Sequence, residues 1–363
     1  MKRVLCVLAM VLLISMLAAC VGEAYAGEVD YADDYDDYAD GYDYDEYDDY
    51  DEPELEPDDE IDTDISVYEL AQIELAQIAA YYFSRLQAIW DADDGALWGI
   101  RLDSPIVFFC AESHIVVANR PDAEGEFERK NVGGVDVYIG TRRLFWTGSS
   151  IRHWDGQAGV AIPFQFINDP YMFIGIRGMT DDATSLLMGI IHYIMHAIQP
   201  TLMGVDGAWA PAVGNSAVAK HSYVAEVRAL VNALNAESES NARLAYIHAA
   251  LSYRHARRTV YNTAAAENLF IVVEGLAVYS EVMLVLNRQE TMELLDTWVD
   301  IIADSDSATD AAITYGYYGG TLYGLLLDDL GVSWRHLASR DFDMGDLLME
   351  VLGITYFLDV ELP

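Results

Sequence analysis

The sequence changes character abruptly near residue 65, and this change confines a packed fold to the residues that follow. Residues 23–64 contain 22 Asp and Glu but no Lys or Arg, and much of the stretch repeats Tyr with Asp. Such a segment repels itself and offers no periodic apolar face to bury. We therefore expect residues 20–64 to form a disordered tether, which reaches on the order of 100 Å when fully stretched. Binding of Ca²⁺ or a wall polymer, or tyrosine modification, is the sharper alternative, but the fixed ligand spacing of an EF-hand loop is missing.

The first 19 residues are laid out like a secretory signal peptide. A basic start precedes an apolar run over residues 4–17, which is shorter than the roughly 20 residues that span a bilayer. The run ends in Leu17-Ala18-Ala19-Cys20, which resembles the lipobox of bacterial lipoproteins. This resemblance implies cleavage before Cys20, acylation of its thiol and anchoring to the extracytoplasmic face of the cell membrane. The alternative is an ordinary signal peptide that is followed by a chance Cys.

Cysteine and charge content indicate how the fold is stabilised and which kind of partner is disfavoured. Cys6 would leave with the signal and Cys20 would carry lipid, so only Cys110 remains, and we expect no internal disulfide. Packing must then stabilise the fold, and a chain of 363 residues with 53% hydrophobic side chains is long and apolar enough for that. The net charge of −40 argues against nucleic acid as a partner.

The order of apolar patterns after residue 65 predicts one α+β domain over residues 65–363. A helical pattern over 65–91 is followed by short β-type runs, which are ALWGI, PIVFFCA, HIVVANR, VDVYIG, AGVAIPFQF and MFIGI. From Thr180 onward the chain reads as helical, and Pro200 is expected to end the first of these helices. Further helical patterns cover residues 216–237, 240–258, 263–286, 290–304, 308–329 and 344–352. Strands first and helices afterwards indicate short antiparallel strands followed by a mainly helical half.

Two histidines in the helix that starts near residue 180 form a candidate metal site. His192 and His196 are four residues apart, so they lie on one face of a helix about 5–6 Å from each other. Both imidazoles can then reach one metal ion. A histidine pair of this kind is a weak signal by itself, because two histidines in a helix can simply be hydrogen-bonded in the core or exposed to solvent.

A carboxylate in a later apolar helix strengthens this candidate. Glu274 follows Ile-Val-Val and interrupts what would otherwise be a buried stripe. A buried charge is costly unless it is paired or bound to a metal. The simple alternative is an ion pair with an arginine, for which Arg254, Arg257 and Arg258 are the candidates. With two neutral histidines, however, a carboxylate completes a familiar Zn²⁺ ligand set.

Several segments in register resemble bacterial gluzincin-type zinc metallopeptidase-like proteins. Their pattern is HExxH, then ExRAL, a basic stretch and EGLAxY. The corresponding segments here are residues 192–196, 226–230, 253–258 and 274–279, with further similarity at 116–125, 323–328 and 334–335. The resemblance covers roughly residues 97–352. It implies a zincin-like fold with His192, His196 and Glu274 as Zn²⁺ ligands.

One departure from that family concerns the general base. Tyr193 stands where HExxH has Glu, the residue that takes a proton from the attacking water. A phenol has an unperturbed pKa near 10, so it is a poor base at neutral pH. Loss of a positioned base typically costs about 10²–10⁴ in rate. The resemblance is therefore to a metallopeptidase whose base has been removed.

Further carboxylates and tyrosines are candidates for roles beside the metal ligands. Glu267 and Glu281 lie seven residues on either side of Glu274, so either could orient a ligand histidine, as could Glu226. Ion pairing or solvation is the simpler explanation for these carboxylates. The run Tyr315-Gly-Tyr317-Tyr318 could supply an oxyanion donor, although aromatic packing explains it equally.

Three functions remain open from sequence alone. The first is a membrane-anchored lipoprotein whose metallopeptidase-like domain keeps a Zn²⁺ site, has little or no peptidase activity and binds a peptide or protein. The second is an active zinc-dependent hydrolase in which another group replaces the missing base. The third is a metal-free binding or scaffold lipoprotein.

Overall fold

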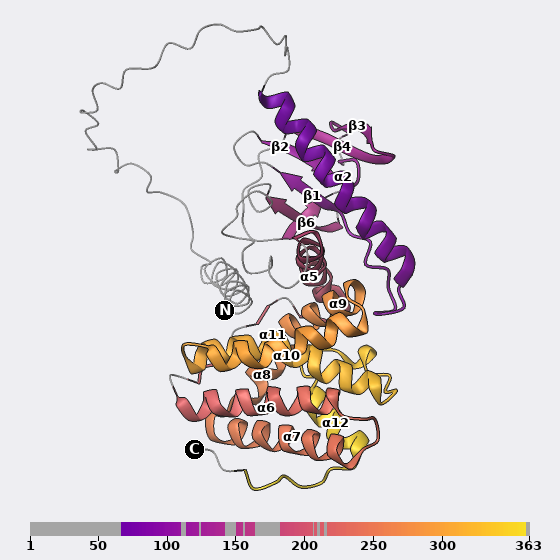
Figure 1. Cartoon of the computed structure of the whole chain (residues 1–363). Helices are drawn as coiled ribbons and strands as arrows, with labels where there is room; N and C mark the ends of the chain where they lie inside the picture. Colours follow the sequence, from indigo (N-terminus) through magenta and orange to yellow (C-terminus); the bar gives the residue numbers. More distant parts are fainter. Residues whose placement is uncertain are drawn as a thin grey trace, which may run out of the picture.

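The computed structural model combines a sheet with a larger set of helices (Figure 1). It describes residues 67–109, 114–122, 125–141, 150–154, 157–163, 182–205, 207–208, 211–213 and 216–360. Among these residues one long helix comes first, six strands follow it, and helices make up the rest. The expected α+β class is therefore confirmed. Cys20, Cys110 and the acidic tract lie outside the described residues.

The opening helix α2 spans Val67–Asp93 and lies along the sheet (Figure 1). Its course agrees with the helical pattern over residues 65–91. The ring of Phe108 in the sheet lies 5.9 Å from that of Tyr82 and 5.6 Å from that of Phe83, centroid to centroid. Contacts between these aromatic rings therefore hold the helix against the strands.

The sheet is mixed, with strand order β3-β4-β2-β1-β6-β5. Its strands are β1 (Ile106–Phe109), β2 (Ile115–Ala118), β3 (Glu128–Val132), β4 (Val135–Thr141), β5 (Ser150–Trp154) and β6 (Gln157–Pro163). Neighbours run antiparallel, except that β1 pairs with β6 in parallel. The expectation of antiparallel strands is wrong for this pair. Since β2 occupies one edge of β1, the chain reaches the other edge only after a long crossover, which parallel pairing requires.

Alternation along the central strands divides their side chains between two cores. Ile106 and Phe108 belong to the main core with α2, whereas Val107 and Phe109 pack with Phe127 on the opposite face. Successive side chains of a strand point to opposite faces, so both faces of β1 are buried. The edge strands β3 and β5 have the sequences ERKNV and SIRHW, whose charges hide any alternation. For that reason neither was expected from sequence, although charges are typical of edge strands.

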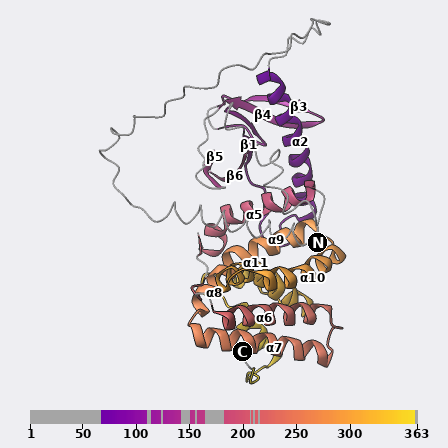
Figure 2. The same ribbon diagram turned by 60° about the vertical axis from the view of Figure 1, so that its left-hand side comes forward.

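The helices stack away from the sheet in successive layers (Figure 2). They are α5 (Asp182–Met203), α6 (Ala217–Asn235), α7 (Asn241–Tyr261), α8 (Ala264–Phe270), the π turn η1 (Ile271–Gly275), α9 (Leu276–Val285), α10 (Arg288–Asp304), α11 (Ala308–Asp329), the 3₁₀ turn η2 (Arg335–Leu337) and α12 (Met344–Leu352). Helix α5 lies next to the sheet and contacts α9, while α6 and α7 lie at the far end (Figures 1 and 2). Side chains that accept backbone N–H groups fix the starts of five helices, and these caps are Ser216, Ser240, Asn287, Ser307 and Asp343.

Two local expectations are wrong. The run Ala96–Ile100 forms a turn, because the carboxylate of Asp93 accepts the N–H groups of Gly95 and Leu97 and holds the chain bent. Leu97 and Trp98 of this run are buried in the core without forming a strand, whereas Ile100 is exposed. Pro200 does not end its helix, which continues to Met203. Its missing N–H costs one bond near a helix end, where backbone groups commonly lack α-helical partners. The run MFIGI and Thr180 lie outside the described residues.

Two segments are long and apolar enough to cross a membrane by length and composition. They are Thr184–Met203 and Ala264–Val285, and 50% and 67% of their most apolar windows are buried inside the protein. Core helices of a soluble fold pass the same test. Their apolar character is accounted for by the packing of α5 against α9.

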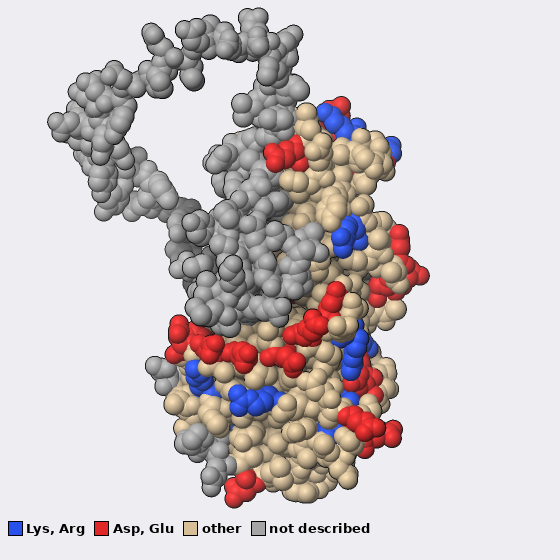
Figure 3. Space-filling model, viewed as in Figure 1, with Lys and Arg blue, Asp and Glu red and all other residues tan. Residues whose placement is uncertain are grey.

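Charge on the surface follows from where the arginines are placed. Arg243, Arg254 and Arg257 are all buried. Their positive charge is therefore withdrawn from the surface into internal ion pairs. On the face seen in Figure 3, acidic side chains form a band across the helical half, and basic side chains are fewer.

Candidate metal centre

Helix α5 places the two histidines of the HxxxH motif next to each other. The Nε2 atoms of His192 and His196 are 2.9 Å apart. Neighbouring positions Ile191, Ile194 and Met195 are buried in the core and fix the rotation of the helix. The histidine side chains remain 13% and 24% exposed, so an ion can reach them from outside. One face of α5 thus packs, while the adjacent face presents two imidazoles.

Glu274 approaches both histidines from the segment that follows α8. Its Oε2 lies 3.4 Å from Nε2 of His192 and 3.3 Å from Nε2 of His196. The three ligand atoms all lie within 4.8 Å of one another. Within the residues that the structure describes, this is the one His, Cys, Asp and Glu group with such convergence. The expected ligand residues are therefore brought together.

A π turn and a close helix crossing aim Glu274 at the histidines. Glu274 lies in η1, where one hydrogen bond spans five residues and the helical spacing widens. The next residue, Gly275, touches the backbone of α11. A Cβ there would lie 2.7 Å from the carbonyl oxygen of Gly316 and 2.8 Å from Cα of Gly320. No larger residue fits at this crossing, so glycine sets how closely the Glu274 segment approaches α11.

Hydrogen bonds on the far side of each imidazole define which nitrogen is free. Nδ1 of His192 lies 2.5 Å from a carboxylate oxygen of Glu281. Nδ1 of His196 lies 3.0 Å from Oε1 of Gln199. Carboxylate and amide oxygens only accept, so both Nδ1 atoms carry the proton. In the neutral form of each ring, Nε2 is then the nitrogen that bears the lone pair, and it faces Glu274.

The charged groups around the site favour a positive charge between the three ligand atoms. Burial opposes ionisation of His192, but Glu281 and Glu274 outweigh burial and raise the pKa of His192 to about 10. Burial also opposes ionisation of Glu274, but His196 and His192 hold its pKa well below the usual range. Without a metal, a proton on His192 therefore fills the space between the ligand atoms. A divalent cation bound by all three atoms would take the place of this proton.

Two tyrosines border the same group. Tyr193 has its ring 5.9 Å from that of His192, centroid to centroid. Burial, followed by Glu274 and Glu281, raises its pKa well above the usual value, so its phenol stays protonated. Tyr317 of α11 hydrogen bonds with Glu274, and burial raises its pKa as well. Both hydroxyls are therefore neutral donors beside the site.

The structure places Glu226 and Glu267 elsewhere than the proposed supporting positions. The Oε2 atom of Glu226 lies 2.7 Å from Arg257 Nη1, and both Glu267 oxygens accept from that guanidinium at 2.9 Å. Glu267 also accepts from Arg258. These arginines are thus engaged away from Glu274, so the ion-pair alternative for Glu274 is wrong. Glu281 lies in α9, which packs against α5, whereas Glu267 lies in α8 on the other side of the π turn, and only Glu281 contacts a histidine.

The tyrosine run of α11 divides between three environments. Tyr315 donates to Glu226 at 2.7 Å. Tyr318 stacks on Trp298 with ring centroids 4.2 Å apart. Only Tyr317 reaches the histidines, with its ring centroid 6.2 Å from that of His192. Packing and internal hydrogen bonding therefore explain two of the three tyrosines.

Sequence reasoning missed Gln199, which is only 2% exposed. It lies three residues after His196, on a face that the apolar pattern predicts to be buried. A buried amide at that spacing was the available signal, because a polar group is buried only when its hydrogen bonds are satisfied.

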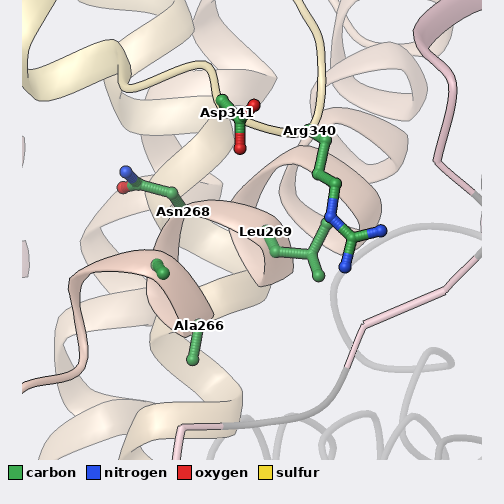
Figure 4. A pocket seen from close by; sticks show the side chains of 6 residues that line it. Ala266, Asn268, Leu269, Arg340 and Asp341 are labelled. Atoms are coloured by element: carbon green, nitrogen blue, oxygen red, sulfur yellow. The ribbon is translucent and has the colours of Figure 1, made fainter.

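A cavity of about 460 Å³ opens beside the start of α8 (Figure 4). Small apolar side chains form one wall, and Asn268, Arg340 and Asp341 supply polar atoms. None of the three candidate ligands lines it. This cavity is therefore distinct from the metal centre.

Comparison of the chain with protein-family models, curated proteins and solved structures gives no match.

Proposed function

We propose that residues 65–363 form a zincin-like, metallopeptidase-like domain that binds Zn²⁺ through His192, His196 and Glu274. The observation that carries this proposal is the convergence of two imidazole Nε2 atoms and one carboxylate oxygen, between which a metal ion would replace the proton held by His192. Both imidazoles have their Nδ1 proton committed to Glu281 and Gln199. Two neutral histidines and a carboxylate match the Zn²⁺ ligand sets of hydrolytic sites. A Zn²⁺ ion held there would supply a Lewis acid.

The same site supports binding of a peptide or protein more than its cleavage. Hydrolysis needs a base at hydrogen-bond distance from the attacking water. Tyr193, at the position of the family's base, stays protonated. Among the described residues, the carboxylates nearest the histidines are already engaged, Glu274 with both rings and Glu281 with Nδ1 of His192. We therefore infer little or no peptidase activity.

The location of this domain is a proposal from sequence. A lipid on Cys20 would anchor the chain to the extracytoplasmic face of the cell membrane, and the acidic tract would hold the domain away from the bilayer. The ligand would then be a peptide or protein outside the cytoplasm.

The test is the metal content of the purified protein and of His196→Ala. We expect about one Zn²⁺ per chain in the parent and a loss of metal in the variant, because two ligands seldom hold zinc without a third. His336→Ala is the matched control, since His336 is exposed and outside the ligand group. A parent without zinc would favour the metal-free binding lipoprotein, and a variant that keeps its zinc would show that His196 is not a ligand and contradict the proposed site. Zinc together with robust peptide cleavage by the parent would favour the active hydrolase.

A further inference from the structure

Gln199 is a buried side chain that joins the two helices of the candidate metal centre. It lies in α5, one turn after His196, and is 2% exposed. Its Oε1 lies 3.0 Å from His196 Nδ1. Its Nε2 donates to the carbonyl oxygens of Val273 at 2.6 Å and Val272 at 3.2 Å. All the polar atoms of this amide are therefore used.

The two backbone carbonyls determine which way the amide of Gln199 faces. Carbonyl oxygens only accept, so the NH₂ group must point at Val272 and Val273. The amide oxygen must then point at His196, and it can only accept a proton from Nδ1. His196 is thereby held as the tautomer whose Nε2 lone pair faces the ligand group.

The same two carbonyls belong to the π turn that carries Glu274. The N–H of Leu276, which in an α-helix would donate to Val272, donates instead to Ile271. In the π turn, the carbonyl oxygen of Val272 therefore does not accept from the N–H group that it would bind in a regular α-helix. Gln199 supplies a side-chain donor at this point, which favours the widened turn over a regular helix.

We infer that Gln199 is a positioning residue that couples the two halves of the metal centre. Through its oxygen it sets the tautomer and orientation of His196, and through its nitrogen it holds the π turn that aims Glu274. Both ligands then depend on one side chain that does not touch the ion. This inference rests on the proposed function in that the positioned groups are Zn²⁺ ligands.

Two substitutions separate the two contacts. Gln199→Leu removes both, and we expect Zn²⁺ affinity to fall about 10–100-fold, the usual effect of losing a group that orients a ligand. Gln199→Glu keeps an acceptor for His196 but offers the carbonyls no donor. We expect Gln199→Glu to keep the His196 tautomer and still bind Zn²⁺ more weakly than the parent. Gln289→Leu is the matched control, because Gln289 is an exposed side chain of α10, and we expect parent affinity from it.

The tautomer of His196 is measured in the metal-free parent by ¹⁵N NMR, with the signal assigned by its loss in His196→Ala. We expect the Nδ1-protonated form in the parent and in Gln199→Glu, and a mixture of tautomers in Gln199→Leu. A parent His196 protonated on Nε2 would overturn the inference even if no variant folds. Unchanged Zn²⁺ affinity in a folded Gln199→Leu protein would also overturn it. Failure of the parent to bind Zn²⁺ would contradict the proposed function, whereas the tautomer result is independent of metal.

Discussion

Tyr193 is the residue that argues most strongly against peptidase activity at the proposed zinc site. Its phenol lies in a largely buried position beside His192, and the nearby carboxylates Glu274 and Glu281 further disfavour its ionisation. A base at this point must lose its proton near neutral pH, and this phenol does the opposite. It remains a hydrogen-bond donor, which suits contact with a bound carbonyl or carboxylate group.

Placing a carboxylate at this position should reveal whether the proposed site can support peptide cleavage. For Tyr193→Glu we expect peptide cleavage, measured as kcat/KM with a fluorogenic peptide library, to rise about 10²–10⁴-fold over the parent. Tyr193→Phe is the control, because it removes the hydroxyl without adding a base, and it should show no gain. If the parent already cleaves at the rate of Tyr193→Glu, the inference of a lost base is wrong.

The meeting of four helices creates a second polar group that supports the fold and not the metal centre. Arg257 of α7 is fully buried between Glu226 of α6 and Glu267 of α8. Its guanidinium carbon also lies 3.9 Å from the ring centroid of Tyr223. Asp343, at the start of α12, pairs with two further arginines of α7. Because each charge has a partner, burial is tolerated, and removal of one partner leaves an uncompensated charge.

Acid sensitivity is expected to arise from this ion-paired group. Burial opposes ionisation of Glu267, but Arg257 and Arg258 outweigh it and hold its pKa far below the usual range. A lowered pKa in the folded state contributes stability above the unfolded pKa of about 4.3, and this contribution is lost as the pH falls further. The free energy of unfolding should therefore drop steeply below about pH 4.

Glu267→Gln tests this origin through urea unfolding between pH 2 and pH 7. At neutral pH we expect a loss of about 3–5 kcal/mol, since Arg257 keeps its charge and loses a partner. Below about pH 4 the slope against pH should become shallower, by up to about 1.4 kcal/mol per pH unit. The exposed Glu350→Gln is the control, and it should leave both quantities unchanged. An unaltered slope in Glu267→Gln would exclude Glu267 as the source.

At the scale of the whole molecule, the charge of the chain is unevenly distributed along the sequence. The acidic tract holds 22 of the 60 carboxylates. In the folded part several arginines are engaged in internal ion pairs, and acidic side chains form a band on the face seen in Figure 3. Acidic side chains of this kind repel polyanions.

The proposed membrane anchor is tested by changing Cys20. In a bacterial host we expect the parent to take up labelled palmitate and to sediment with membranes. Cys20→Ala should lose both properties, because the acyl chains supply the binding energy at about 0.8 kcal/mol per buried CH₂. Cys110→Ala is the control and should keep both. Membrane association of Cys20→Ala without label would show that something other than a lipid holds the protein there.

Local sequence was sufficient for much of the helical half. The expected ranges 308–329 and 344–352 match α11 and α12 residue for residue, because Ser307 and Asp343 are capping side chains that mark these starts locally. The His192–His196 pair was equally accessible, since the helical repeat alone makes residues four apart neighbours. The edge strands β3 and β5 were missed, because their residues carry no apolar alternation and are held by pairing with β4 and β6.

The sequence by itself determined the α+β class, most helices and the identity of the three converging residues. Tertiary structure alone decided which other carboxylates contact these residues. Glu267 and Glu281 were equivalent by spacing, yet they lie on opposite sides of the π turn, where Glu267 pairs with Arg257 and Glu281 contacts His192. Gln199 and Tyr317 joined the site only through the packing of α5 and α11 around that turn. The physical reason is that spacing within one helix follows from its repeat, whereas contact between helices depends on how closely their backbones approach, as at Gly275 and Gly320.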